Sequence, residues 1–484
     1  MKKSMTLNVI LNAVRTVLSL LFPLITYPYV SRILGPLGIG QATYANSLVS
    51  YVSLVAALGI ATYAVSVGSA LREDDNKFKT FASTVFTLNV ITCVIAYLIL
   101  AIILLFIPAL EAYRLLMLIY GLQIFLNTIG VEWLYTIEEK YMYITVRSIV
   151  FQILSMVCLF AFVRDKSDVT GYAFAQIVST GGVYIPNFIN AVKKGYIKLN
   201  FSDKLLTVLK PALFIFATTI ATTVYVNLDT TMLGIICGDV EVGYYSSATK
   251  LYNIVKGVLN SVATVYSARL GFCFYKEKDE YNSYFKECLG TVTMMSVPMA
   301  IGGTMLAREL ILFLSGEEFI AATPAMRILM ISLIPSTMGN IMGIGALLIV
   351  RQEKIIMYVS IVGAIFNTAT NLFFIPAYGA TGAAGTTLAT ECIVAVALIR
   401  YAMKYAGINL NFRHIANSVI SSILFVPVWI VSEGIINNST IRMVVVMVIC
   451  ALLYALCMII LKDDIMIMYT DKFKNKVFQT NNNR

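Results

Sequence analysis

The sequence predicts an all-α polytopic membrane protein with about 14 transmembrane helices, and three observations carry this prediction. Apolar residues make up 59% of the 484 residues and charged residues only 13%, whereas soluble domains contain about 45–50% and about 25%. The apolar residues come in blocks of about 20 or more, the length that a helix needs to cross a bilayer. The short alternating strands of a β-barrel do not occur.

The predicted spans fall into two sets of six and a final pair. The first six lie near 6–30, 41–68, 82–108, 112–137, 142–163 and 169–191. Six more lie near 206–236, 243–268, 289–314, 322–349, 355–377 and 380–402, and the last two near 411–432 and 439–461. The start, Met1-Lys2-Lys3, resembles a signal peptide, but the apolar stretch behind it is too long and carries Arg15. We therefore expect an uncleaved first helix.

The distribution of lysine and arginine predicts the orientation. With the N-terminus in the cytoplasm, 24 of the 36 Lys and Arg residues lie on the cytoplasmic side and 6 on the outer side. Cytoplasmic loops of membrane proteins carry such an excess. Both termini are therefore expected in the cytoplasm, and the net charge of +10 reflects topology and not a nucleic-acid partner.

Two short patterns recur in order along the chain. They are Leu34-Gly35, Gly40 and Ala45 with Leu233-Gly234, Gly243 and Ala248, and Thr170-Gly171-Tyr172-Ala173 with Thr381-Gly382-Ala383-Ala384. The equivalent helices are six apart, an even number, so two halves would share one orientation about a pseudo-two-fold axis along the membrane normal. We expect six-helix lobes at 1–192 and 206–402, two additional transmembrane helices at 411–461 and a cytoplasmic tail at 462–484.

Polar residues form a continuous stripe on each of two predicted helices. Asn8, Asn12, Arg15 and Ser19 share one face of the first span, and Asn253, Lys256, Asn260 and Thr264 share one face of the eighth. A charge in hydrocarbon costs at least about 2.5–3.5 kcal/mol, so such residues face a cavity, pair or snorkel. Two cations in a common cavity suit an anionic head group such as pyrophosphate, while snorkelling of Arg15 to the cytoplasmic interface is the alternative.

Other charges within spans have two interpretations. Lys250 lies about 120° around the helix from Lys256, and Asp229 is its predicted structural partner. Asp229 could instead bind a coupling proton or sodium ion, and Glu391 carries the same ambiguity. Arg147 lies close to a cytoplasmic end, where we expect it to snorkel, with Glu139 as a candidate partner.

Composition argues against an enzyme. The eight cysteines form no CxxC pair and the chain has one histidine, His414, so no metal site, no cofactor and no His-containing dyad are expected. A third class of function, a membrane polymerase or acyltransferase, usually needs sizeable outer loops. The longest outer connections here are about ten residues.

Three stretches resemble Wzx-type polysaccharide flippases and run in that family's order along the chain. They are Glu132-Trp133-Leu134-Tyr135 with Glu139, Tyr141, Ile144 and Arg147; Asn227-Leu228-Asp229 with Met232-Leu233-Gly234, Val242-Gly243-Tyr244-Tyr245 and Ala248-Thr249-Lys250; and Gly363-Ala364-Ile365-Phe366-Asn367 with Asn371, Ile375-Pro376, Tyr378-Gly379, Gly382-Ala383-Ala384 and Thr390-Glu391.

The resemblance implies a MATE-like fold of the multidrug/oligosaccharidyl-lipid/polysaccharide exporter superfamily. It implies alternating access that carries undecaprenyl-diphosphate-linked oligosaccharide across the bacterial plasma membrane, for surface polysaccharide biosynthesis. Arg15, Lys250 and Lys256 lie on helices that line a cationic cavity in such flippases. The expected partners are this substrate, membrane lipid, and a polymerase and glycosyltransferases of the pathway. The alternative is a cation-coupled MATE-type small-molecule exporter, which would prefer an acidic cavity.

Overall fold

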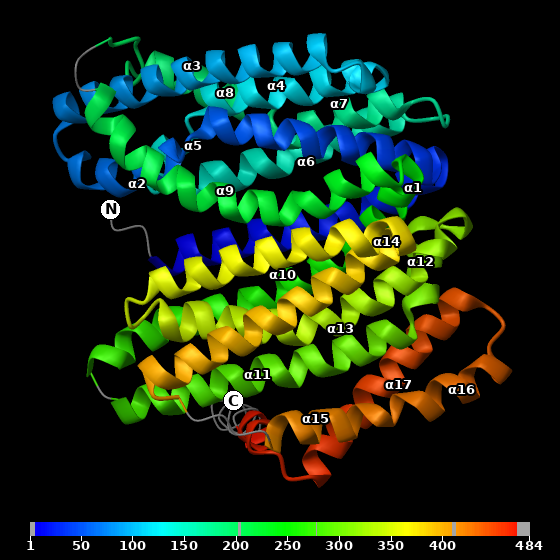
Figure 1. Ribbon diagram of the computed structural model, residues 1–484. Coiled ribbons are helices and arrows are strands. Elements are labelled where there is room, and N and C mark those ends of the chain that lie inside the picture. The colour runs from blue at the N-terminus through cyan, green and yellow to red at the C-terminus, as the bar shows by residue number, and fades with distance from the viewer. Residues whose placement is uncertain (1–4, 202–204, 277, 409–412, 472–484) are drawn as a thin grey trace, which may run out of the picture. The chain divides into compact units, whose positions relative to one another are not determined.

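The computed structural model describes residues 5–201, 205–276, 278–408 and 413–471. It describes the backbone alone for most of the first part of α1, for several positions of α9, for position 268 and the last two residues of α10, and for the first two residues of α11. Regular structure in these ranges is helical throughout (Figure 1). The elements are α1 (Met5–Ala57), α2 (Ile60–Leu71), α3 (Asp75–Phe106), η1 (Pro108–Tyr113), α4 (Arg114–Gly130), α5 (Glu132–Ile137), α6 (Tyr141–Phe162), α7 (Val169–Thr180), α8 (Tyr184–Lys193), α9 (Leu205–Ile236), α10 (Asp239–Lys276), α11 (Lys278–Met305), α12 (Ala307–Ser315), η2 (Glu317–Ala322), α13 (Thr323–Asn340), η3 (Ile341–Leu347), α14 (Glu353–Ala406), α15 (Arg413–Ile423), α16 (Phe425–Ile435) and α17 (Ser439–Ile460).

The helices confirm the predicted fold class. Nine segments of the described chain are long and apolar enough to cross a membrane, and two of them, Phe22–Leu71 and Glu353–Ala406, are 50 and 54 residues long. A span needs only about 20 residues, so each of these two segments can supply two spans. The helices are thus consistent with the fourteen predicted spans, and the chain is a multi-pass membrane protein.

Glycines divide the two longest helices. Gly35, just before Pro36, has φ 65° and ψ −176° inside α1, and Gly379 has φ 53° and ψ −133° inside α14. Both conformations lie at positive φ, which glycine adopts without the penalty that a Cβ imposes. The divisions fall in or beside the predicted gaps between spans, 30–41 and 377–380. Each of these helices is therefore a pair of spans joined by a sharp corner.

The chain folds into two compact units, Met1–Ser246 and Ser247–Arg484. In unit 1, α1 packs against α3, α4, α6 and α9, and α6 packs against α7. In unit 2, α13 packs against α11 and α14, and α11 packs against α15. The predicted lobes at 1–192 and 206–402, with the two added helices and the tail, stay a prediction.

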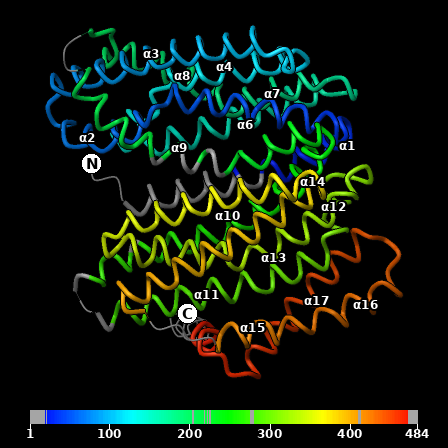
Figure 2. The backbone as a smooth tube through the Cα atoms, in the orientation of Figure 1, coloured from blue at the N-terminus to red at the C-terminus, as the bar shows by residue number. Residues whose placement is uncertain are grey.

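A buried ion pair fixes the last transmembrane helix within unit 2. The Arg442 Nη2 atom lies 2.6 Å from Glu309 Oε1, and the two side chains are 10% and 2% exposed. Arg442 stands in the first turn of α17 and Glu309 in α12, so the pair joins elements that are distant in sequence. Figure 2 shows α15, α16 and α17 as neighbouring tubes, in agreement with the packing of α17 against both α15 and α16.

The corner of α1 and the start of α10 meet through a reciprocal contact in unit 1. A Cβ on Gly40 would lie 1.7 Å from the Asp239 carbonyl oxygen, and a Cβ on Gly243 would lie 2.0 Å from the Pro36 carbonyl oxygen. The Thr43 and Ser246 hydroxyls, 203 residues apart, lie 3.2 Å from each other. Pro36 and Asp239, and also Gly40 and Gly243, are 203 residues apart, like Thr43 and Ser246. The two segments therefore contact each other through equivalent residues, as in an interface on a two-fold axis.

A second glycine contact recurs in both halves of the sequence. A Cβ on Gly171, near the start of α7, would lie 2.4 Å from the Phe162 carbonyl oxygen that ends α6. A Cβ on Gly382, three residues past the corner of α14, would lie 2.2 Å from the Phe374 carbonyl oxygen. These two glycines belong to the Thr-Gly patterns that the sequence matched. Both contacts let a helix start close against the carbonyl end of the helix before it, which supports the internal repeat.

We predict that alanine at either glycine of the reciprocal contact destabilises the protein. Gly40→Ala or Gly243→Ala forces two backbones apart, and overpacking of this kind costs about 1–3 kcal/mol. Gly271→Ala, in α10, is the matched control because a Cβ there meets nothing within 4 Å. Thermal unfolding in detergent measures the effect. Equal midpoints for all three variants would contradict the close approach.

Candidate functional site

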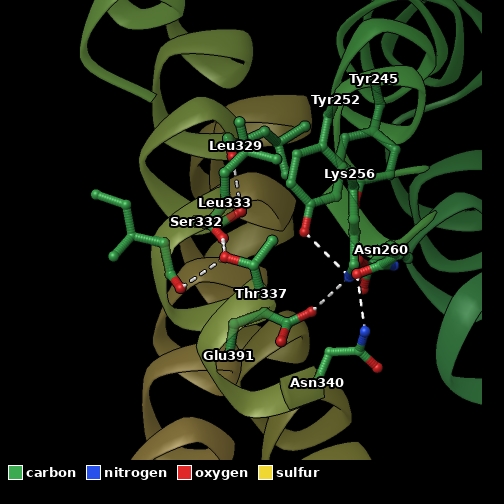
Figure 3. Close-up of polar contacts among 12 residues, drawn as sticks. Tyr245, Tyr252, Lys256, Asn260, Leu329, Ser332, Leu333, Thr337, Asn340 and Glu391 are labelled. Atoms are coloured by element: carbon green, nitrogen blue, oxygen red, sulfur yellow. Dashed lines mark hydrogen bonds and ion pairs between the residues drawn. The ribbon is translucent and has the colours of Figure 1, made fainter. Parts of the chain in front are cut away.

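A partly buried ion pair lies between α10 and the second half of α14 in unit 2. Lys256 Nζ donates to Glu391 Oε1 at 3.1 Å, with the two side chains 27% and 12% exposed. Lys256 Nζ also donates to the Tyr252 hydroxyl at 3.2 Å and lies 5.3 Å from the centre of that ring. Tyr252 is buried one turn before Lys256, so the lysine ammonium is held between a carboxylate and an aromatic residue (Figure 3).

An amide pair continues the polar stripe one turn further along α10. Asn340 Nδ2 donates to Asn260 Oδ1 at 2.9 Å. Asn340 is the last residue of α13, where the helix passes into the π-helical segment η3. Short π-helical segments occur frequently at functional sites because they alter the register of side chains within a helix. Figure 3 shows Asn340 and Glu391 converging on the Lys256–Asn260 face of α10.

The site combines one cation, one anion and neutral hydrogen-bonding groups. Since Glu391 balances Lys256, the resting pair carries no net charge, which lowers the cost of placing it among membrane-spanning helices. Removing one partner of a buried pair leaves the other uncompensated, which is strongly destabilising. A ligand that takes the lysine must therefore supply negative charge of its own.

Several predicted site residues lie apart from this pair or outside the described side chains. Asn253 lies on the same stripe of α10 and is exposed. Asp229 is buried in α9 and accepts a hydrogen bond from the Tyr245 hydroxyl at 2.7 Å. Asn8, Asn12 and Arg15 lie in the part of α1 whose side chains are outside the described residues. The pairing of Lys250 with Asp229 and the cavity role of the cationic residues stay predictions.

The expectation for Arg147 is wrong. Its side chain does not snorkel but is 4% exposed, with Nη2 3.6 Å from Glu132 Oε2. It also donates to the Asn187 side-chain oxygen, and its guanidinium lies 5.5 Å from the Tyr143 ring centre. Glu139 instead pairs with Arg72 at 2.7 Å. The physical reason is the buried side-chain amide of Asn187 in α8, 40 residues away. Together with Glu132, it offsets the cost of removing the guanidinium from water.

The expectation of no His-containing dyad is also wrong. His414 Nδ1 lies 2.9 Å from Asp463 Oδ2, and Asn417 Nδ2 donates to the same oxygen at 2.9 Å. The imidazole and the carboxylate are 5% and 1% exposed. The pair is separated by 49 residues, so it forms only when α15 packs beside the segment that follows α17. His414 and Asn417 lie about one helical turn apart in the sequence, and this spacing of two polar residues could have indicated a polar site on one face of the helix.

We predict that the Lys256–Glu391 pair is energetically coupled. Lys256→Met alone leaves the partly buried carboxylate of Glu391 without its partner and costs about 3 kcal/mol. Adding Glu391→Gln to that variant recovers part of the loss, because no unpaired charge remains. Unfolding by heat or denaturant in detergent completes the double-mutant cycle, with Lys210→Met as an exposed control. Simple addition of the two single losses would show that the groups do not interact.

We predict a pH dependence of stability from Asp463, which lies beyond the end of α17. Burial raises the pKa of its carboxyl, but hydrogen bonds from Asn417 and His414 outweigh burial and place the pKa below its ordinary value. The ionised Asp463 carboxylate contributes its full stabilisation of the folded protein above about pH 3.9, the ordinary pKa of aspartate in the unfolded chain. This contribution is lost as the pH falls through the lower pKa of Asp463 in the folded protein. Unfolding measured from about pH 6 down to about pH 3 tests this. A curve for Asp463→Asn as steep as that of the wild type would contradict it.

Comparisons with known proteins agree with this architecture. The family model described as "Polysaccharide biosynthesis protein" matches residues 5–266, and the model described as "MatE" matches residues 215–373. A protein of Escherichia coli (strain K12) described as "Putative O-antigen transporter" is 24% identical over 409 residues, covering 83% of this chain and 97% of that protein. A protein of Shigella dysenteriae with the same description is 22% identical over 392 residues, covering 78% and 95%.

Two solved structures share the fold. The lipid II flippase MurJ in an inward closed conformation matches with a TM-score of 0.76 and 16% identity, over 95% of this chain and 100% of that one. An inward-facing multidrug resistance MATE family transporter matches with a TM-score of 0.62 and 15% identity, over 81% and 94%. These likenesses confirm the MATE-like fold that the sequence predicted. Because the first family model covers more than half of the residues, the chain belongs to the polysaccharide biosynthesis protein family.

Proposed function

We propose that this protein is a flippase for lipid-linked oligosaccharides in the bacterial plasma membrane. Its substrate would be an undecaprenyl-diphosphate-linked oligosaccharide, moved from the cytoplasmic to the outer leaflet by alternating access. Membership of the polysaccharide biosynthesis protein family is the observation that carries the proposal. The descriptions of two relatives as O-antigen transporters and the fold shared with a lipid II flippase support it.

In this proposal the diphosphate binds the cationic residues. Lys256 would release Glu391 and bind a diphosphate oxygen, because a phosphate carries more negative charge than a carboxylate. Arg15 and Lys250 would supply the further cations, while Asn8, Asn12, Asn253 and Asn260 would offer hydrogen bonds to the glycan. The polyprenyl chain would stay in the lipid, because exposing its apolar surface to water is unfavourable.

Glu391 then provides a route to coupling. When the diphosphate takes Lys256, Glu391 would be open to a coupling proton or sodium ion. Release of the substrate would restore the Lys256–Glu391 pair at 3.1 Å. Asp229, buried and hydrogen-bonded to Tyr245, is the second candidate for an ion-coupling or structural role.

The proposal includes an orientation and pathway partners. The excess of lysine and arginine on one side supports cytoplasmic termini. A flippase moves its substrate without breaking covalent bonds, so the protein would act as a transporter and not as an enzyme. Glycosyltransferases would supply the substrate on the cytoplasmic side, and a polymerase would consume it on the outer side.

A cation-coupled small-molecule exporter is the second candidate. The match to the MatE model over residues 215–373 and the partly buried carboxylate of Glu391 favour it. An exporter of cationic drugs would use Glu391 as the substrate ligand and would displace Lys256 instead. The two candidates therefore assign opposite partners of one ion pair to the substrate.

The decisive experiment is a flipping assay in liposomes. Purified protein is reconstituted with a polyprenyl-diphosphate oligosaccharide in both leaflets, and an external glycosidase reports the accessible glycan. We expect accessibility to rise from about half to nearly all with the wild type, and to stay at the level of empty vesicles with Arg15→Ala or Lys256→Ala. Lys354→Gln, an exposed cation at the start of α14, is the control that should retain transport.

The outcomes separate the candidates. Normal flipping by well-inserted Arg15→Ala and Lys256→Ala variants would refute the cationic site while keeping the flippase. No flipping by the wild type, even with an imposed proton or sodium gradient and a changed glycan, would refute the flippase. Gradient-driven efflux of a cationic dye that is lost in Glu391→Gln would then establish the exporter.

A further inference from the structure

The second half of α14 has one buried face and one exposed face. Ala395 and Ala402 are buried, whereas Val396 and Arg400 are exposed. Arg400 follows Glu391 by nine residues, which places it about 180° around the helix from that carboxylate. Because Glu391 faces α10, the exposed face of α14 points away from the candidate transport site.

An open groove with a volume of about 770 Å³ lies along this exposed face, and among the described residues α14 alone lines it. Near the middle of the span the lining is apolar and includes Ile393 and Val396. Toward the end of the helix it consists of Arg400, Tyr401 and Lys404. The groove is therefore amphipathic, with a cationic end and an apolar remainder.

The two cations of the groove lack an acidic partner. Arg400 and Lys404 are four residues apart, so they are neighbours on the helix surface, where like charges destabilise the helix. The sequence contains no acidic residue between Glu391 and Glu433, and within the part of the chain that the structure describes no carboxylate lies within 4.0 Å of either cation. The exposed Arg72, by contrast, has a carboxylate oxygen 2.7 Å away. An anionic ligand would balance the charge of the groove.

Two further features place these cations at the depth of lipid headgroups. Lys404 lies in the last turn of the apolar segment Glu353–Ala406, and the ends of spans lie where the hydrocarbon core meets the headgroups. The rings of Tyr401 and Tyr405 stack with their centres 6.4 Å apart, and Lys404 Nζ lies 5.2 Å from the centre of the Tyr405 ring. Tyrosine is enriched at this interface, and lysine and arginine near the membrane surface attract anionic lipids.

We propose that this groove of α14 binds an anionic phospholipid. The headgroup phosphate accepts hydrogen bonds from the Arg400 guanidinium and the Lys404 ammonium, and an acyl chain lies along Ile393 and Val396. Charge and apolar length together select this occupant, because a soluble phosphate leaves the apolar part uncovered and a lipid without net charge leaves the cations unbalanced. The groove lies on the face of α14 opposite Glu391, so this lipid is distinct from the transported substrate.

Native mass spectrometry of the full chain in maltoside micelles tests this proposal, because it counts the lipids that stay bound. The probes are phosphatidylglycerol and phosphatidylcholine with the same acyl chains, titrated separately. We expect the wild type to bind phosphatidylglycerol with the higher affinity. Arg400→Gln/Lys404→Gln should lower that affinity about 30-fold, because each cation near the membrane surface contributes about fivefold. The affinity for phosphatidylcholine should stay unchanged.

A matched control separates this groove from a general effect of positive charge. Arg351→Gln/Lys354→Gln also removes one arginine and one lysine, both exposed, at the other end of α14, and it should keep the wild-type affinity. Lys404→Arg retains the charge and should also bind phosphatidylglycerol. Thermal unfolding without added lipid verifies that each variant is folded.

Four outcomes would overturn the proposal. They are equal phosphatidylglycerol affinities of the wild type and the Arg400→Gln/Lys404→Gln variant, an equal loss in the matched control, no preference of the wild type for phosphatidylglycerol over phosphatidylcholine, and displacement of phosphatidylglycerol by millimolar inorganic phosphate. The last outcome would assign the cations to a soluble anion. The assay contains no lipid-linked oligosaccharide, so its failure leaves the proposed function untouched.

Discussion

A charge placed among membrane-spanning helices must find a partner, because the surrounding lipid offers neither water nor counterions. Among the described residues, three ion pairs meet that constraint, Lys256–Glu391, Arg147–Glu132 and Arg442–Glu309. The first and the last join helices that are far apart along the chain, and Arg147–Glu132 joins the consecutive helices α5 and α6. The pairs therefore select one packing of apolar helices that hydrophobicity alone would leave ambiguous, since lipid-facing and core-facing surfaces are equally apolar.

The same constraint explains why the candidate site contains a cation and an anion together. An unpaired lysine at this position would be costly, whereas Lys256 and Glu391 together form a pair without net charge. In the proposed function, an anionic substrate would displace Glu391 from this pair. The cost of opening is offset when the entering group carries more negative charge than the carboxylate that leaves. A diphosphate meets this condition and a neutral sugar does not. The glycan would then be held by amides such as Asn260, and recognition would begin at the lipid diphosphate.

Close contacts between backbones at glycines are the second feature that determines how the helices pack. Gly40 and Gly243 allow the corner of α1 and the start of α10 to exchange carbonyl contacts, and Gly171 and Gly382 allow two later helices to start against the helices before them. Small residues drive helix association in membranes because they bring backbones together. The reciprocal arrangement around Thr43 and Ser246 supports the internal repeat that the sequence predicts.

The sequence by itself determined the membrane class and the helical, MATE-like fold, because both follow from local composition and from the length of the apolar segments. It also pointed to Lys256 and Asn260 as members of one polar stripe. Only the tertiary structure decided the partners: Glu391 for Lys256, Glu132 and Asn187 for Arg147, and Asp463 for His414. Those partners lie 135, 15, 40 and 49 residues away. A single sequence shows which charges need partners, but the pairing depends on which helix faces meet, and that is settled by packing across the whole unit.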